Sequence, residues 1–331
     1  MDNRNVTHKV TVITGYYNRA DSLRLTIESI LQQDYDDFEL IVFNDCSTDN
    51  TKELLDKLVS EYKDPRLKIR HHSQNKGFTL GMIEAIQSSQ SEYVCVQGSG
   101  DVSLQGRIRK QAEILDNNPA VGVVGCYYEN YIETLGVSRF RDKVADDMTF
   151  EDLLEENVFS HGEVMFRRSS YEEVGGYRKE FVNCQDYDLW LRMIKVCEFR
   201  SVKELLYRRY VRYDGVSYNP KSFLRQVRYA CLCRDLASME KDEERTLLGK
   251  ISPASLESLV PLSEFRVQKQ VYSAVLRSMA FDGRSEAVTL IRHGVSSSVV
   301  STILEIAVNV YSHRYAGPLR RLMSPLLGLR G

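Results

Sequence analysis

The sequence lacks several features that would assign the protein to other classes. No run of about 18 apolar residues occurs, so we expect no membrane-spanning helix. The start, MDNRNVTHK, has no apolar stretch and does not resemble a signal peptide. The seven cysteines include no CxxC pair, and the CxC of Cys231 and Cys233 fits zinc-ligand spacing poorly. We therefore expect reduced, partly buried thiols in a cytoplasmic protein. A net charge of −2 argues against a nucleic-acid partner.

What is present indicates a globular chain with an α/β region. Of the 331 residues, 43% are hydrophobic and 27% charged, which suits one large or two medium domains. Apolar runs of strand length alternate with stretches of helical spacing, such as Leu23, Ile27 and Ile30. This alternation predicts a mainly parallel twisted sheet with flanking helices. The predicted strands in this part of the chain are 10–14, 39–43, 67–70, 93–97 and 121–126.

The middle of the chain has a less regular pattern than the first 126 residues, and the last third is helical. Residues 127–147 predict a hairpin or a mobile loop. Further helices are expected at 149–155 and 185–195, and further strands at 163–167, 198–202 and 205–211. After Ser217 only helical patterns remain, at 221–237, 240–249, 264–280, 284–293 and 297–312. We therefore expect an α/β domain over residues 1–217 and a helical region over 218–331.

Polar residues follow several of the predicted strands. The first strand leads into GYYNR, the second into NDCSTD and the fourth into GSGD. Because ligands in open α/β sheets bind outside the carboxyl ends of the strands, these segments indicate one pocket for a polar ligand. The segment after the first strand lacks the pattern G-x-G-x-x-G, which argues against a dinucleotide-binding dehydrogenase.

The first two strand ends offer contacts for a nucleoside. Thr14 and Tyr16 are candidates to line a nucleobase pocket, and Asn18 to contact the ligand or stabilise the turn. Turn chemistry alone would explain most of that segment. The Asp45 carboxylate can accept a hydrogen bond from a nucleobase imide or a ribose hydroxyl. The alternative is that Asp45 and Asp49 cap the next helix.

The fourth strand ends in a Gly-Ser-Gly turn, followed by a basic helix. Gly98 and Gly100, on either side of Ser99, would let backbone N–H groups approach phosphate oxygens. Asp101 is a candidate ligand for a divalent cation or a sugar hydroxyl. The alternative is a plain tight turn in which Asp101 caps the helix.

Two further segments carry candidate catalytic groups. In QDYDLW, Asp186 lies near the positive end of a predicted helix, where an ionised carboxylate is favoured and can accept a proton from a hydroxyl nucleophile. It would otherwise only cap the helix. His161 is a candidate for contact with acceptor or phosphate, or a structural histidine. His71 and His72, beside Asn75-Lys76-Gly77, fit either a nucleotide loop or a solvated turn.

In their order and spacing, these strings resemble the family 2 glycosyltransferases, which are inverting enzymes of GT-A fold. The resemblance covers about residues 8–217 and rests on VTVITGYYNR, FNDCSTDNT, GSGDVSLQGRIRKQ, SHGEVMFRRSSYEEVGGYR and QDYDLWLR. It implies transfer of a sugar from a nucleotide-sugar, with a UDP-sugar favoured, to a hydroxyl of a glycan or lipid-linked acceptor. Asp186 would be the base, Asp45 would hold the nucleobase, and the product would be surface polysaccharide or glycolipid.

The sequence departs from the family pattern at the metal motif. Gly98 and Gly100 replace two acids and leave Asp101, so the implied Mn²⁺ or Mg²⁺ would be held weakly. Tyr213 stands where the family often has a histidine. Diphosphate binding would then depend on backbone amides and on Arg107 or Arg109. A non-catalytic nucleotide-sugar or glycan-binding subunit is the alternative function.

The C-terminal helices leave several alternatives open: contact with the acceptor, with a membrane surface or with a second copy of the chain, or packing on the protein's own core. Residues 301–331 contain four arginines and one acidic residue, Glu305, interleaved with leucines. Basic and apolar residues at helical spacing can lie on an anionic membrane surface, here the inner face of the cell membrane. The same helices would otherwise pack on the protein's own core or on a second copy of the chain.

Overall fold

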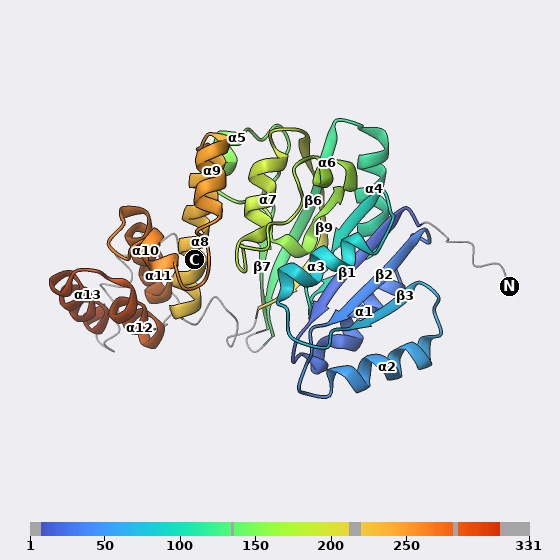
Figure 1. Cartoon of the computed structure of the whole chain (residues 1–331). Coiled ribbons are helices and arrows are strands. Elements are labelled where there is room, and N and C mark those ends of the chain that lie inside the picture. The colour runs from blue at the N-terminus through green and yellow to red at the C-terminus, as the bar shows by residue number, and fades with distance from the viewer. Residues whose placement is uncertain (1–7, 134–135, 212–219, 281–283, 312–331) are drawn as a thin grey trace. The chain divides into compact units, whose positions relative to one another are not determined.

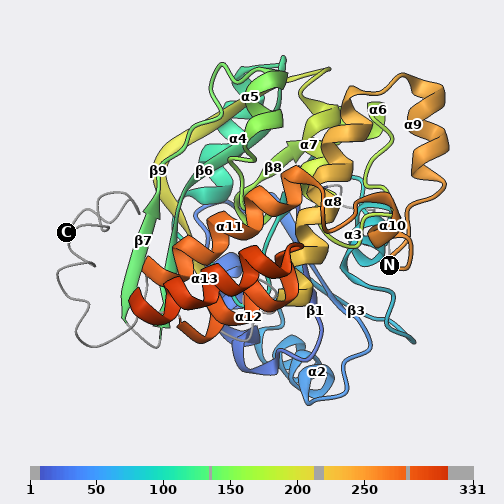
Figure 2. The same cartoon turned by 90° about the vertical axis from the view of Figure 1, so that its left-hand side faces the viewer.

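The computed structural model describes residues 8–133, 136–211, 220–280 and 284–311. The chain divides into two compact units, Met1–Arg212 and Tyr213–Gly331. The boundary predicted after Ser217 falls among residues outside the described ranges. Both units are drawn in Figure 1 and, from another side, in Figure 2.

The first unit is built on one nine-stranded mixed sheet, with strand order β3-β2-β1-β4-β8-β6-β9-β5 and β7 paired to β6. Strands β1 to β4 pair in parallel, as does β6 with β9. Strand β8 runs antiparallel between β4 and β6, β7 is antiparallel to β6, and β5 to β9. The strands are β1 (Val10–Tyr16), β2 (Phe38–Asn44), β3 (Leu67–His71), β4 (Tyr93–Val96), β5 (Val102–Ser103), β6 (Val121–Ile132), β7 (Val137–Arg141), β8 (Met165–Arg167) and β9 (Glu198–Tyr210).

Helices cover both faces of this sheet, which explains why β1 and β2 are buried along their whole length. On one face, Val10 and Val12 share a core cluster with apolar residues of α1 (Leu23–Leu31), α2 (Thr51–Tyr62) and α4 (Arg107–Asn117). On the other face, Phe43 meets α3 (Phe78–Gln87) so closely that only glycine fits at position 81. The remaining helices of this unit are α5 (Phe150–Glu155), α6 (Arg168–Glu173) and α7 (Gln185–Met193), with short 3-10 turns η1 (Ala20–Ser22) and η3 (His161–Glu163).

The predicted α/β fold is confirmed, and the sheet is more mixed than expected. Segment 127–147 contains a hairpin, in which Tyr128 of β6 pairs with Arg141 of β7. The two strands expected at 198–202 and 205–211 form the single strand β9, whose register against β6 shifts between Val202 and Leu205. A β-bulge of this kind interrupts the alternation of side chains without ending the strand. The two-residue strand β5 is too short to leave a sequence pattern.

The second unit is helical throughout its described residues 220–280 and 284–311. Its helices are α8 (Pro220–Ser238), α9 (Lys241–Leu248), α10 (Leu256–Leu259), α11 (Phe265–Ala280), α12 (Arg284–Gly294) and α13 (Ser298–Tyr311). Helices α11, α12 and α13 lie side by side, as Figure 2 shows. Cys231 and Cys233 are buried free thiols in α8. No helix in the described ranges combines the length and the apolar character needed to span a membrane.

Candidate active site

The loops at the carboxyl ends of the central strands are fastened to one another. Asn18, after β1, accepts a hydrogen bond from the backbone N–H of Thr48, after β2, at 2.8 Å. Arg19 donates from Nη1 to the carbonyl oxygen of Ser99, after β4, at 2.8 Å. The predicted polar segments therefore meet at one edge of the sheet.

Asp45 shapes the loop that follows β3. Its buried carboxylate lies 2.9 Å from Nδ1 of His72 and accepts hydrogen bonds from the backbone N–H groups of Lys76 and Gly77, both at 2.8 Å. These contacts use three of the roughly four acceptor positions of a carboxylate. Asp45 thus fixes residues 72–77 and keeps at most one position for a ligand. Neither aspartate is the N-cap of α2, which is Asn50; Asp49 lies one residue earlier and accepts from the N–H of Thr51 at 3.0 Å.

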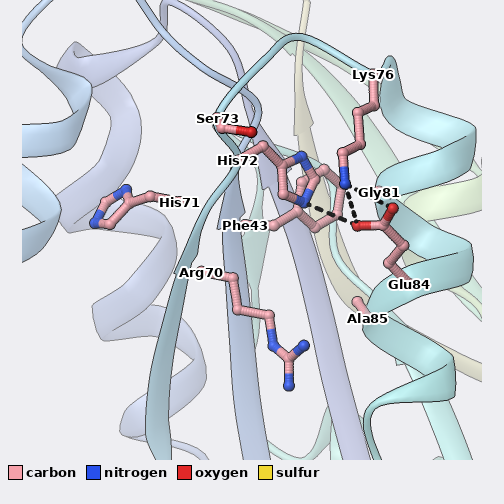
Figure 3. A pocket seen from close by; sticks show the side chains of 9 residues that line it. All are labelled: Phe43, Arg70, His71, His72, Ser73, Lys76, Gly81, Glu84 and Ala85. Atoms are coloured by element: carbon pink, nitrogen blue, oxygen red, sulfur yellow. Dashed lines mark hydrogen bonds and ion pairs between the residues drawn. The ribbon is translucent and has the colours of Figure 1, made fainter.

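A hollow of about 440 Å³ lies beside this loop, between β2, β3 and α3. Lys76 crosses it to Glu84 at 2.7 Å, and Nε2 of His72 lies 3.6 Å from the same carboxylate (Figure 3). His71 turns away from the hollow, to Asp56 at 3.0 Å. Of the two adjacent histidines, His72 is therefore the one whose ring faces Glu84 in the hollow.

The residues predicted to line a base pocket from β1 serve the scaffold instead. Thr14 and Tyr16 are buried. The Tyr16 hydroxyl accepts a hydrogen bond from the N–H of Gly100 at 3.3 Å, and burial raises the pKa of Tyr16 to about 12. Asn18 is engaged with the loop after β2 in a left-handed backbone conformation, φ 52°. Tyr16 therefore holds the turn after β4, and Asn18 holds the loop after β2.

The Gly-Ser-Gly turn also differs from the expected phosphate cradle. The N–H of Asp101 bonds to the carbonyl of Gly98 at 3.2 Å and closes a β-turn, with Gly100 at φ +87°. The N–H of Gly98 donates to the Tyr207 hydroxyl at 3.0 Å, and that of Gly100 to Thr26 Oγ1 at 3.1 Å. Neither amide is thus available to a phosphate oxygen.

Asp101 faces β9 rather than the open side of the turn. Its Oδ2 accepts from the Tyr207 hydroxyl at 2.7 Å, and its Oδ1 from the N–H of Tyr210 at 3.0 Å. Burial raises the pKa of Asp101, and these hydrogen bonds oppose the rise. Asp101 therefore ties the turn to the end of β9, and its predicted role as cation or sugar ligand finds no support in this geometry.

The two arginines predicted to bind diphosphate lie elsewhere. Arg107 is fully buried and donates to Gln97, Ser103 and the carbonyls of Val96 and Gly162, at 2.7 to 2.9 Å. Arg109 pairs with Asp34 at 2.9 Å, in the segment that leads into the amino end of β2. The prediction for both is corrected. Arg107 is buried and connects the turn to residue 162, and Arg109 is held by ion pairs with Asp34 and Glu113.

Asp186 stands in the first turn of α7, half-buried, with one carboxylate oxygen 3.5 Å from Nδ2 of Asn157. Near it, His161 is half-buried, and its Nε2 lies 2.7 Å from the Tyr177 hydroxyl. Burial lowers the pKa of His161, while the charge of Asp186 acts in the opposite direction. Asp186 is thus the candidate catalytic base, and its carboxylate makes little use of its hydrogen-bonding capacity within the described residues.

Glu163 belongs to the same cluster, and the sequence did not single it out. It is 1% exposed, its Oε1 accepts from the N–H of Ser160 at 2.7 Å, and its Oε2 has no hydrogen-bond partner in the described part of the chain. Burial raises its pKa to about 7, and the charge of Asp186 adds to the rise. A glutamate beside a short strand gives no signal that it is buried, so sequence reasoning had little means of finding it.

Comparison with known proteins identifies the family. The model of glycosyl transferase family 2 matches residues 11–175. EpsE of Bacillus subtilis, assigned as a glycosyltransferase, is 32% identical over 237 residues, which is 69% of this chain and 83% of EpsE. The chain belongs to glycosyl transferase family 2. TuaG of the same organism, assigned to teichuronic acid biosynthesis, is 27% identical over 188 residues, covering 56% of this chain and 72% of TuaG.

Solved glycosyltransferases share the fold of this family 2 member. S. aureus TarS 1-349 in complex with UDP-GlcNAc superposes with a TM-score of 0.56 at 16% identity, over 94% of this chain and 92% of that one. The mannosyltransferase PcManGT of Pyrobaculum calidifontis, in complex with GDP-Man and Mn²⁺, gives 0.58 at 14% identity, over 97% and 84%. The predicted GT-A fold is thereby confirmed, and membership of the family confirms the predicted glycosyltransferase activity.

The fold family suggests a divalent cation, but the residues after β4 do not fit one in this glycosyltransferase. A Cβ at position 98 would lie 2.2 Å from Asp101 Oδ2 and 2.8 Å from the Tyr207 hydroxyl, so an acid cannot occupy that position without rearrangement. Both oxygens of Asp101 are already engaged. Within the ranges that the structure describes, no three His, Cys, Asp or Glu side chains are grouped to hold a metal. Tyr213 lies outside those ranges.

Proposed function

We propose that this glycosyltransferase moves a sugar from a nucleoside-diphosphate sugar to a hydroxyl of a glycan or lipid-linked acceptor, with inversion at the anomeric carbon. A UDP-sugar is the first donor to test, because TarS binds UDP and UDP-GlcNAc. The observation that carries the proposal is Asp186, a half-buried carboxylate at the start of α7 whose one hydrogen bond within the described residues is the 3.5 Å contact with Asn157.

In this proposal the acceptor oxygen attacks the anomeric carbon from the face opposite the diphosphate. The new carbon–oxygen bond forms as the bond to the diphosphate breaks, and the hydroxyl proton passes to Asp186. The helix amino terminus favours the ionised carboxylate that this step requires. His161 and Tyr177 form a wall beside Asp186, and Asp45 holds the nucleotide loop in place.

A non-catalytic nucleotide-sugar or glycan-binding subunit is the second candidate, favoured by the glycines at the metal motif. A binding subunit needs no base, and the unengaged Asp186 carboxylate argues for the enzyme. Turnover of a donor separates the two, because a binding subunit neither transfers nor hydrolyses the sugar.

We also infer a cytoplasmic protein that makes surface polysaccharide or glycolipid and contacts the anionic inner face of the cell membrane. Support comes from α13, where Val299, Ile303, Ile306 and Val310 are 54 to 67% exposed and recur at helical spacing. The arginine-bearing residues after α13 provide the complementary charge in the sequence. A lipid-linked acceptor would make this contact useful.

The direct test of the function is a donor screen by thermal shift with UDP-, GDP- and dTDP-sugars, because a ligand that binds the folded state raises the apparent stability. The donor that stabilises the protein is then incubated with and without EDTA, and release of the nucleoside diphosphate is measured. Binding followed by release supports the proposal. Binding without release under either condition would support the binding subunit instead.

A further inference from the structure

Arg19 lies on the turn where the family normally holds its cation. It follows β1 and donates from Nη1 to the carbonyl and hydroxyl oxygens of Ser99, at 2.8 and 3.3 Å. The same nitrogen lies 3.9 Å from the point where a Cβ on Gly100 would stand. The Arg19 guanidinium thus lies beside Gly100, the position at which the family motif has an acid.

Arg19 lies near the buried Asp101 carboxyl: burial raises the pKa of Asp101, and the charge of Arg19 acts against that rise. No carboxylate of the described residues lies within ion-pair distance of Arg19, and the Nε and Nη2 of Arg19 make no hydrogen bond there. The Arg19 side chain is half-buried and lines a hollow of about 150 Å³ together with Ser99 and Gly100. Asp21 and Glu133 line the same hollow. A half-buried arginine that keeps unused donors is poised for an anion.

The neighbouring groups indicate which anion this is. The turn 98–101 follows β4, between the nucleotide loop held by Asp45 and the segment of His161 that adjoins Asp186. A nucleotide-sugar that reaches from one to the other carries its diphosphate past this turn. The amides of Gly98 and Gly100 are engaged, and so is the carboxylate of Asp101. Arg19 contacts the turn directly, and the exposed Arg209 is a second cation close enough to act on Asp101.

We propose that the Arg19 guanidinium replaces the divalent cation of the family and binds the donor diphosphate directly. Guanidinium and phosphate groups match in geometry and form paired, charge-assisted hydrogen bonds. Arg19 remains charged at any pH at which the enzyme folds, so diphosphate binding does not require Mn²⁺ or Mg²⁺. This inference rests on the proposed function, since it assigns a residue to the same donor site.

The test measures binding rather than turnover. Titration calorimetry in EDTA compares UDP and GDP with uridine and guanosine, using the wild type, Arg19→Met, Arg19→Lys and Arg24→Met. Arg24 is the matched control, because it loses the same charge on α1 while pairing with Glu61 at 2.6 Å. We expect Arg19→Met to weaken the diphosphate by about 10- to 100-fold, the factor for one lost charged hydrogen bond, and to leave the nucleoside unchanged.

The outcomes separate this inference from the proposed function. Arg19→Lys should keep part of the diphosphate affinity, and Arg24→Met all of it, with melting temperatures confirming that each variant folds. Equal diphosphate affinity in wild type and Arg19→Met, or wild-type binding only after Mn²⁺ is added, would overturn the role of Arg19 while leaving the glycosyltransferase intact. Failure of the wild type to bind either nucleotide, with or without Mn²⁺, would overturn the donor site itself.

Discussion

Glu163 predicts a stability that falls as the pH rises through neutrality. The carboxyl group is buried with one oxygen unpaired, and its pKa rises from the ordinary 4.5 to about 7. Between these values the folded protein holds a proton that the unfolded chain has released. The stabilisation is therefore complete below the unfolded pKa and is lost as the pH rises through about 7. The difference corresponds to about 3 kcal/mol, since one pKa unit is worth about 1.4 kcal/mol.

The assay is urea unfolding of wild type and Glu163→Gln at pH values from about 5 to 9. Glutamine imitates the protonated carboxyl, so the two proteins should be similar near pH 5, and the variant should be about 3 kcal/mol more stable near pH 9. Glu53→Gln, at an exposed position of α2, controls for the loss of one carboxylate. A wild type and a Glu163→Gln variant with the same pH dependence would refute the reasoning, because Glu163 would then be ionised in the folded protein.

Three further results follow from the site and the C-terminal helices. Asp45→Ala should weaken nucleotide binding by calorimetry and also destabilise the fold by about 2 kcal/mol or more, because it leaves the N–H groups of Lys76 and Gly77 unpaired; unchanged binding would leave Asp45 a purely structural residue. Gly98→Asp should lower stability by about 1–3 kcal/mol through the clash with Asp101 and should gain no Mn²⁺ affinity, and a stable variant that binds Mn²⁺ would contradict this. Changing Ile303 and Ile306 together to serine should reduce flotation with phosphatidylglycerol liposomes relative to the control Thr302→Ser. Equal flotation of the two variants argues against the membrane contact. Loss of self-association of the double variant in sedimentation indicates that a second copy of the chain covers this face.

The sequence predicted the strands and the edge of the sheet where the site lies. Strands β1, β2 and β4 are apolar on both faces, because helices cover both sides of the sheet, and such runs stand out in a sequence. The polar segments that follow them meet where the topology of a parallel sheet requires. Asp186 was predicted as the base by the same reasoning, since an acid at a helix start is visible in the sequence.

The direction in which each polar side chain points was not predictable. Tyr16, Asn18 and Asp101 have the chemistry to bind a ligand, but they bond to neighbouring loops that are distant in sequence, such as Asp101 to β9. Arg107 stands in a basic segment, yet it is buried because carbonyls and side chains of four residues in three segments accept its hydrogen bonds. Sequence identifies what a group can bind, and tertiary contacts decide whether it is still free to do so.

Arg19 and Glu163 show the converse error. Neither was singled out, because an arginine in a turn and a glutamate before a strand are usually solvated. Their surroundings set them apart: Arg19 lies beside a turn in which Gly98 and Gly100 replace two acids of the family motif, and Glu163 lies in the interior beside Asp186. A missing acid in a family motif could have prompted a search for a compensating cation nearby in the sequence.

The most direct test of sugar transfer by this site is the Asp186→Asn variant. Asparagine keeps the shape of the side chain but cannot accept the acceptor proton. With the donor identified by the screen, we expect unchanged donor affinity by calorimetry and a turnover at least about 10²-fold lower, the scale of general base catalysis. Near-normal turnover of a folded Asp186→Asn protein would contradict the assignment of Asp186 as the catalytic base.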